Sequence, residues 1–333
     1  MEVDAFTPAW WCRSAHAQTV WASALRPMPQ VFGVRRERWD TPDGDFLDVD
    51  HVPTEAGWPT LIILHGFESS SAAQASRGLL RAAARQGWRG LGINFRSCSG
   101  AINELRRSYH AGETSDLHWI IQRVVSERPH DPVCCVGSSL GANVLLKYLG
   151  EQADRAPAQL KAAVAISAPF DLAISARAFE QSVMNRVYMS RLIRSLKQKT
   201  LAKLRRYPDL VDRARLEAMR TIREFDDLVT APVHGFVNAE DYWTASSCRQ
   251  FLPSIRRPTL LISSVDDPII PADVLPRQEV TRNRWLTGAF TEAGGHVGFI
   301  SGPPWRPVAW AEQRAMVFFA QHLSQTPPHD ARP

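Results

Sequence analysis

The stretch VCCVGSSLG, residues 133–141, decides the fold of this chain. Its first four residues form a short apolar run that is typical of a buried strand, and the helix-favouring segment 142–149 follows directly. The last five residues read G-x-S-x-G, with Ser139 at the centre. Glycines two positions before and after a serine let a strand and a helix approach closely across a tight turn. The motif therefore predicts a serine nucleophile, although small residues that merely lead into a buried helix give the same pattern.

Short apolar runs alternate with helix-like segments on both sides of this motif. The strand-like runs are 61–64, 91–95, 133–136, 161–166, 259–264 and 284–291, and the helix-like segments are 72–86, 112–127, 139–150 and 306–323. Two further β-like runs, 31–39 and 45–52, flank the turn sequence TPDG at 41–44 and predict a β-hairpin. This order predicts the α/β-hydrolase fold, with a mostly parallel central sheet, helices on both faces and a helical lid insertion.

The expected domain organisation follows from where the alternation stops. Between Arg177 and Arg223 the chain is mostly helix-like and carries 13 basic against 4 acidic residues, a net charge of +9. We expect an N-terminal arm at 1–30, an α/β-hydrolase core at 31–170 and 251–323, a helical lid at 171–250 and a disordered tail at 324–333. The arm holds Trp10, Trp11 and Trp21, which favour packing against the core over an interfacial membrane contact.

A catalytic serine needs a base, and the base needs a carboxylate that orients it. His296 lies in the glycine-rich sequence GGHVGF, residues 294–299, after the last strand-like run. Asp266 and Asp267 follow the run 259–264, and both remain candidates for the acid. We favour Asp267 because an aspartate, one residue, two aliphatic residues and a proline form the usual acid turn. The chain order serine, aspartate, histidine is the one expected for this fold.

The sequence HGFE, residues 65–68, follows an early strand-like run. In this fold the loop at that place donates one backbone N–H to the oxyanion, and the residue after the nucleophile donates a second. We therefore expect the donors to be Phe67 and Leu140. We interpret His65 as a structural residue because His296 already supplies the base.

Composition narrows the remaining functions. The 333 residues are 44% hydrophobic with a net charge of +5, which is too weakly basic to indicate a nucleic-acid partner. No metal-binding or nucleotide-binding motif is present in the sequence, so we expect no metal and no cofactor. The five cysteines have no regular spacing and predict free buried thiols. Without a signal-peptide pattern or a transmembrane-length apolar run, we expect a cytoplasmic protein with at most weak contact to a membrane surface.

The chain also resembles a known family in a series of short motifs. These are PAWW (8–11), HAQT (16–19), DGDFLD (43–48), HGFE (65–68), NFRSCSG (94–100), RSYHAGET (107–114), SLGAN (139–143), SAPFDL (167–172), FDD (225–227), APVHGF (231–236), DDP (266–268) and GGHVGF (294–299). Together they resemble the YheT-like branch of the α/β-hydrolase superfamily, which includes bacterial predicted hydrolases and eukaryotic abhydrolase-domain lipases. The resemblance spans about residues 6–320.

The resemblance implies a charge relay of Ser139, His296 and Asp267 or its neighbour, acting on carboxylic esters. Short-chain esters and monoacylglycerol-like lipids are the expected substrates. Two alternatives stay open: an acyltransferase with the same triad, and a non-catalytic hydrolase-like scaffold. Three positions depart from the family pattern, since Ser97, Ser138 and Ala142 stand where glycine, phenylalanine and glycine are expected. None of these departures removes a catalytic group.

Overall fold

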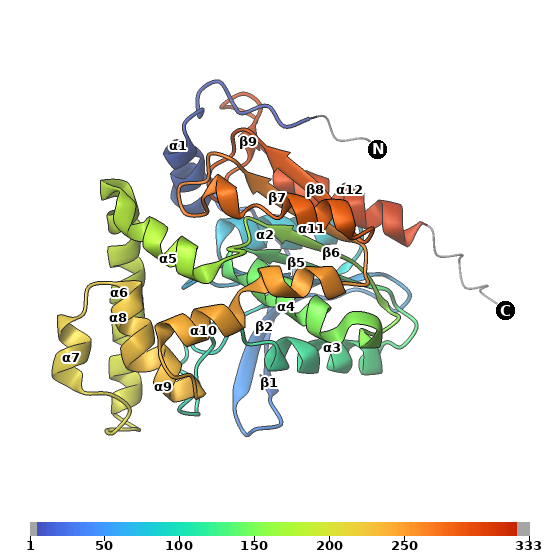
Figure 1. Ribbon diagram of the computed structural model, residues 1–333. Helices are drawn as coiled ribbons and strands as arrows, with labels where there is room; N and C mark the ends of the chain where they lie inside the picture. Colours follow the sequence, from blue (N-terminus) through green and yellow to red (C-terminus); the bar gives the residue numbers. More distant parts are fainter. Residues whose placement is uncertain (1–4, 325–333) are drawn as a thin grey trace.

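In the computed structural model, which describes residues 5–324, an eight-stranded sheet forms the centre of the molecule (Figure 1). Its strands are β1 (Arg35–Asp40), β2 (Phe46–Val52), β3 (Thr60–Leu64), β4 (Arg89–Ile93), β5 (Val133–Ser138), β6 (Leu160–Ile166), β7 (Thr259–Ser264) and β8 (Leu286–Thr291). The spatial order is β1-β2-β4-β3-β5-β6-β7-β8. Strand β2 runs antiparallel to both of its neighbours, and the strands from β4 to β8 are parallel. The sheet is therefore mostly parallel, as the sequence predicted.

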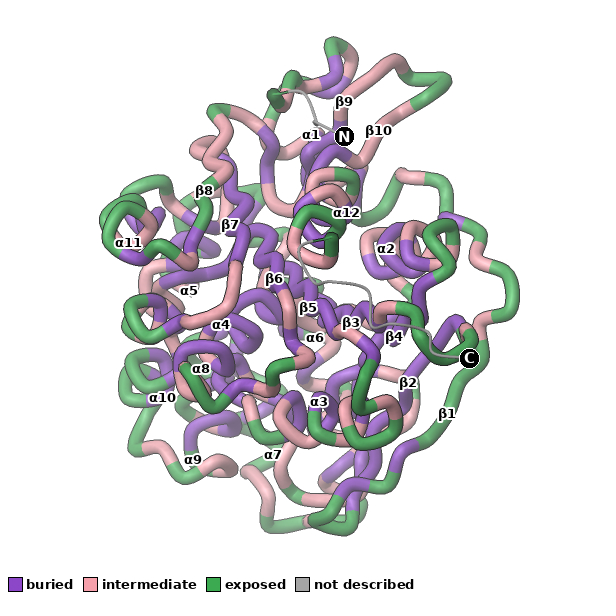
Figure 2. Tube along the Cα trace, turned by 90° about the vertical axis from the view of Figure 1, so that its right-hand side faces the viewer, coloured by how far each residue is buried: buried purple, intermediate pink, exposed green. Residues whose placement is uncertain are grey.

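Helices cover both faces of this sheet. Helices α2 (Gln74–Arg85) and α12 (Trp310–Leu323) pack on one face, and α3 (Ser115–Glu127) and α4 (Leu140–Gln152) pack on the other. Figure 2 shows the buried strands between these layers. Successive side chains of a strand point to opposite faces, and the adjacent Cys134 and Cys135 accordingly belong to different hydrophobic clusters. All five cysteines are buried and free.

The first two strands form the predicted hairpin. Asp40 of β1 pairs with Phe46 of β2, and Gly44 takes a positive φ of 81° in the turn between them. A left-handed backbone is accessible to glycine without a steric penalty, which explains its place in this turn.

A group of helices follows β6 and precedes β7 in the sequence, and most of it lies to one side of the sheet (Figure 1). It consists of α5 (Leu172–Gln181), α6 (Val183–Leu204), α7 (Arg213–Ala218), α8 (Ile222–Phe225), η3 (Asp226–Thr230), α9 (Ala231–His234), α10 (Ala239–Ser246) and η4 (Cys248–Ser254). The boundary between α5 and α6 has a local cause, because the hydroxyl of Ser182 accepts a hydrogen bond from Asn185 N–H and caps α6. These elements lie within residues 171–250, where we expected a lid, except for the last four residues of η4.

The remaining elements are short. They are α1 (Ala15–Val20), η1 (Trp21–Leu25), η2 (Ala153–Arg155), η5 (Ala272–Val274), α11 (Arg277–Arg282), β9 (Ile300–Ser301) and β10 (Val308–Ala309). Residues 1–4 of the predicted arm and 325–333 of the predicted disordered tail lie outside the described residues. Within residues 5–324, none of the helices has the length and apolar character needed to cross a bilayer.

Candidate active site

Ser139 occupies a sharp turn between β5 and α4. Its backbone has φ 51° and ψ −121°, a conformation that a residue with a side chain rarely adopts. Such a conformation costs on the order of 1–3 kcal/mol and persists only where the surroundings hold it. Here the Ser139 N–H donates to Ile166 O of the neighbouring strand at 2.8 Å, so the sheet itself fixes the turn.

The two glycines of the motif are required by close backbone contacts. A Cβ on Gly137 would lie 2.4 Å from Gly141 O, and a Cβ on Gly141 would lie 2.5 Å from His65 O. No real Cβ tolerates contacts of this length with backbone atoms. The glycines therefore let α4 start directly against β5 and against the loop that follows β3.

The structure brings Ser139, His296 and Asp267 together in one hydrogen-bonded series. His296 Nδ1 lies 2.9 Å from Asp267 Oδ2, and His296 Nε2 lies 2.9 Å from Ser139 Oγ. An ionised carboxylate can only accept, so Nδ1 carries the proton and Nε2 is left to accept from the serine hydroxyl. The Asp267 side chain is only 1% exposed, and its other oxygen accepts from Ile269 N–H and Ile270 N–H.

The two candidate carboxylates have different partners. Asp267 contacts the imidazole of His296, whereas Asp266 Oδ1 accepts a hydrogen bond from Gly295 N–H at 2.9 Å. The hydroxyl of Ser167 similarly accepts from Val297 N–H at 3.1 Å. Asp266 and Ser167 thus hold the backbone on either side of His296. The sequence indicated Asp266 as an alternative acid, and it held no signal for this role of Ser167.

The loop after β3 lies directly beside Ser139. A Cβ on Gly66 would be 3.2 Å from Ser139 Cβ, and Phe67 and Leu140 both line the cavity at this point. His65 is buried, and its Nδ1 donates to Gly66 O at 2.7 Å while its Nε2 accepts from Phe95 N–H at 3.1 Å. Burial lowers the pKa of His65 to about 4. A neutral His65 therefore joins this loop to the loop after β4.

The residue after Phe67 connects the same loop to helix α6. Glu68 Oε1 accepts from Tyr109 Oη at 2.7 Å and from Lys199 Nζ at 2.9 Å, and the Glu68 side chain is 1% exposed. The Glu68 N–H also donates to Tyr109 Oη at 2.9 Å. The backbone at Glu68 has a positive φ of 51°, so this ion pair also supports a strained conformation next to the site.

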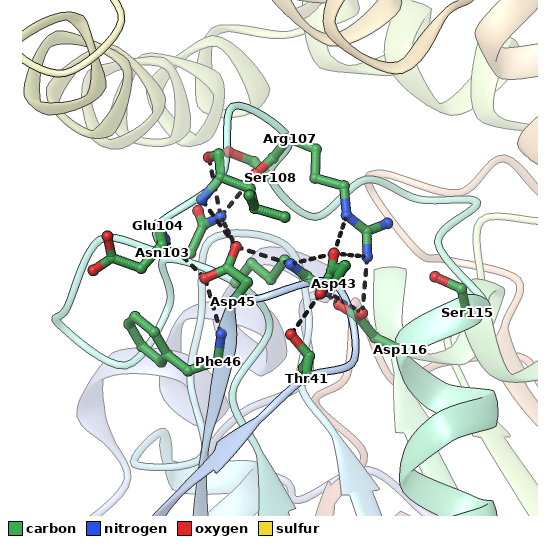
Figure 3. A network of polar contacts seen from close by, with 12 residues as sticks. Thr41, Asp43, Asp45, Phe46, Asn103, Glu104, Arg107, Ser108, Ser115 and Asp116 are labelled. Atoms are coloured by element: carbon green, nitrogen blue, oxygen red, sulfur yellow. Dashed lines mark hydrogen bonds and ion pairs between the residues drawn. The ribbon is translucent and has the colours of Figure 1, made fainter.

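A buried polar network supports one wall of the site (Figure 3). Arg96 donates to Asp116 at 2.7 Å and to Asp45 at 2.8 Å, which joins the hairpin turn to the start of α3. From helix α6, Lys203 Nζ donates to the carbonyls of residues 105–107. Burial lowers the pKa of Lys203 to about 7. The network therefore connects the hairpin, this wall and α6.

One family departure is explained by the same network. Ser97, where glycine is expected, has a positive φ of 64°. Its hydroxyl donates to Asn103 Oδ1 at 2.6 Å and accepts from Asn103 N–H at 3.1 Å. These hydrogen bonds offset the strain that a glycine would avoid.

A cavity of about 420 Å³ lies over Ser139 and His296. This volume falls in the range of roughly 300–1,000 Å³ that is typical of small-molecule sites. The helices that connect β6 to β7 contribute apolar residues to its lining: Phe179, Leu192, Leu196, Phe225 and Val229. The reacting atoms thus face a space suited to an apolar group.

Comparisons with known proteins agree with this architecture. A family model described as the alpha/beta hydrolase fold matches residues 59–303. An esterase of Pyrococcus furiosus superposes with a TM-score of 0.58 at 18% identity, covering 89% of this chain and 97% of that chain. At this low identity the likeness concerns the fold alone, and the fold predicted from the sequence is confirmed.

Among curated relatives, the protein named "Putative esterase YheT" of Escherichia coli (strain K12) is 38% identical over 96% of this chain and 94% of its own length. The monoacylglycerol lipase of Saccharomyces cerevisiae is 31% identical over 81% of this chain and 61% of that protein. The medium-chain fatty acid ethyl ester synthase/esterase 2 of the same yeast is 29% identical over 80% of this chain and 63% of that protein. The chain therefore belongs to the α/β-hydrolase family, in its YheT-like branch, and is a hydrolase.

Proposed function

We propose that this hydrolase is a serine esterase that cleaves carboxylic esters through an acyl-enzyme on Ser139. The observation that carries the proposal is the series of hydrogen bonds from Ser139 through His296 to Asp267, at the wall of the cavity. A serine hydroxyl becomes a strong nucleophile only when an adjacent base takes its proton. The distance of 2.9 Å between Ser139 Oγ and His296 Nε2 supports that transfer.

The proposed reaction has two acyl-transfer steps. Ser139 Oγ attacks the ester carbonyl while His296 Nε2 accepts its proton, and the negatively charged Asp267 stabilises the resulting imidazolium. The backbone N–H groups of Phe67 and Leu140 donate to the oxyanion. His296 then protonates the leaving alcohol, and a water activated by the same imidazole attacks the acyl-enzyme and releases the acid. One oxyanion donor typically contributes about 3–4 kcal/mol of transition-state stabilisation.

The proposed substrate is a short-chain or monoacylglycerol-like ester, whose acyl chain lies in the cavity. The apolar lining described above supports an alkyl chain, and the name of the yeast monoacylglycerol lipase agrees with this class. We assign residues 171–250 as the lid, because helices of this segment line the cavity opposite Ser139. A lid of this kind excludes water from the acyl-enzyme until the alcohol has left.

An acyltransferase is the second candidate, favoured by one observation. One yeast relative is named an ethyl ester synthase as well as an esterase. That name describes both the formation and the cleavage of ethyl esters by that protein. In this chain the two activities would share every step up to the acyl-enzyme. Adding ethanol to the esterase assay separates them, because a transferase diverts the acyl product from free acid to ethyl ester.

The test of the proposal is labelling with a fluorophosphonate probe, followed by mapping of the adduct. We expect one adduct per chain, on Ser139, and loss of ester hydrolysis in Ser139→Ala without loss of the fold. The matched control is Ser190→Ala, which removes an exposed hydroxyl of α6 that bonds only Val187 O. Unchanged turnover in Ser139→Ala would contradict the proposal, and a folded wild-type protein that takes up no label would favour the scaffold alternative.

A further inference from the structure

Helix α1 of the N-terminal arm contacts the backbone of the loop that carries His296. Thr19 Oγ1 accepts a hydrogen bond from His296 N–H at 2.9 Å and donates to Ala15 O at 2.8 Å. The side-chain amide of Gln18 pairs with Ile300, donating to its carbonyl at 3.0 Å and accepting from its N–H at 2.6 Å. Two successive side chains of α1 thus hold the loop at His296 and at the point where β9 begins.

The loop and α1 are in such close contact that only glycine fits at two positions. A Cβ on Gly295 would lie 2.3 Å from Ala15 O. A Cβ on Gly298 would lie 2.8 Å from Gln18 Cβ and 2.4 Å from Gly294 O of the loop itself. Gln18 is fully buried in this contact. Figure 1 shows α1 near β9.

The loop needs support from outside because its own conformation is strained. Val297 and Phe299 have positive φ values of 59° and 47°, and the backbone at Gly295 is also left-handed. Residues with side chains keep such conformations only where surrounding contacts hold them. The N–H groups of Gly295 and Val297 are held by Asp266 and Ser167 of the core, whereas those of His296 and Ile300 are held by the arm.

Helix α1 also reaches the cavity itself. Thr19, and Ala22 and Ser23 after it, line the cavity over Ser139. From the same helix, His16 Nδ1 lies 3.1 Å from the hydroxyl of Tyr188 in α6. The arm therefore contacts both the His296 loop and the proposed lid.

We propose that Thr19 and Gln18 are positioning residues, which keep His296 aligned with Ser139, and that the N-terminal arm is part of the active site. The inference rests on the proposed role of His296 as the base. Thr19 bonds none of the reacting atoms, and it acts by fixing the backbone N–H of His296 itself. A small displacement of this backbone moves Nε2 away from the serine hydroxyl, and misplacement of a catalytic group by about 1 Å can lower the rate about 100-fold.

The experiment compares variants that differ only in the hydroxyl at position 19. Thr19→Ser keeps a hydroxyl, Thr19→Ala removes it, and Thr19→Val removes it while keeping the side-chain volume. The matched control is Thr281→Ala, because the Thr281 hydroxyl makes the same bond to a carbonyl four residues earlier in α11, away from the cavity. For each folded variant we would measure the rate of fluorophosphonate labelling, kcat and KM for an ester, and hydrogen exchange of the His296 amide.

We expect Thr19→Ala and Thr19→Val to label and turn over about 10-fold more slowly than wild type, with KM changed less than about twofold. The His296 amide should exchange faster in both, and Thr19→Ser should restore most of the rate. A labelling rate in Thr19→Ala equal to that in Thr19→Ser would overturn the proposal. Failure of both Thr19→Ala and Thr19→Val to fold would also overturn it, because the hydroxyl would then serve folding rather than alignment. An unlabelled but folded wild type would instead defeat the proposed function, while amide exchange still reports whether Thr19 holds the loop.

Discussion

The two loops that present Ser139 and His296 are held in place by different means. The elbow at 137–141 is fixed by its own glycines and by adjacent strands, with Ser139 N–H bonded to Ile166 O. The loop at 294–299 is fixed by side chains from elsewhere: Asp266, Ser167 and Thr19 lie 29, 130 and 277 residues away from their partners in the sequence. One loop is supported by the sheet, and the other by side-chain hydrogen bonds.

This difference has a consequence for function. An atom added among backbone atoms of the core cannot be accommodated locally, because a close-packed interior transmits the strain to its neighbours. Side-chain hydrogen bonds contribute about 0.5–1.5 kcal/mol each and can be lost singly. We therefore expect substitutions of the elbow glycines, Gly137 and Gly141, to affect folding, and substitutions around the His296 loop to affect mainly catalysis.

The largest expected effect is on kcat, and it distinguishes the neighbouring carboxylates Asp266 and Asp267. Asp267→Asn should lower kcat about 10,000-fold, because an amide cannot stabilise the imidazolium and favours the wrong histidine tautomer. Asp266→Asn should lower it only about 10-fold, since the amide oxygen still accepts from Gly295 N–H. Steady-state kinetics on one ester substrate measures both.

A thermal melt of each variant serves as the control, since both substitutions should leave the protein folded. If the larger loss appeared in Asp266→Asn, the assignment of the acid to Asp267 would be wrong despite its contact with His296.

A pair of glycine substitutions tests the two loops against each other. Gly141→Ala places a Cβ 2.5 Å from His65 O and 2.6 Å from Leu64 O, which are backbone atoms of the core. It should reduce the free energy of unfolding by about 3 kcal/mol. Gly295→Ala places a Cβ 2.3 Å from Ala15 O and 2.8 Å from the Thr19 hydroxyl, so the short helix α1 must shift away from the loop. It should reduce the free energy of unfolding by about 1–2 kcal/mol and also lower kcat.

Urea unfolding and kcat measured on the same preparations give the comparison. Equal losses of stability in the two variants would show that the arm is held as rigidly as the core, and would remove the proposed contrast between the loops.

The elbow was predictable from the sequence because its determinants lie within about ten residues. An apolar strand, two spaced glycines and a helix-favouring segment define Ser139 without any tertiary information. The parallel sheet followed from the alternation of apolar and helical segments in the same way. His296 and the pair Asp266 and Asp267 were predicted from their places after particular strands. The structure joins His296 and Asp267 to Ser139 in one hydrogen-bonded series.

The support of the His296 loop was not predictable by this route. Thr19 and Gln18 lie in the short helix AHAQTV, residues 15–20, which has no periodicity that indicates a distant partner. The tryptophans of the arm indicated that it packs against the core, but not which residues of the core it contacts. Similarly, the network around Arg96 joins three separate segments, and no local pattern specifies which carboxylates meet one guanidinium.

A further expected effect concerns the pH dependence of stability at His65, in the loop beside the elbow. Burial lowers the pKa of His65 from an ordinary 6.5 to about 4, so the unfolded chain binds the proton more readily than the folded protein. The contribution of neutral His65 to stability is therefore complete above about pH 6.5 and is lost progressively as the pH falls toward 4. Between pH 7 and pH 5 this group alone should lower the free energy of unfolding by about 2 kcal/mol.

Urea unfolding at both pH values, in wild type and in His65→Gln, isolates this contribution. The variant has no imidazole at this position, so its loss of stability on acidification should be smaller than that of wild type by the same amount. It should not vanish, because burial also lowers the pKa of His110 to about 3 and that residue remains. An identical pH dependence in both proteins would mean that His65 is not held neutral between Gly66 O and Phe95 N–H. The loop beside the elbow would then gain no pH-dependent stability from His65.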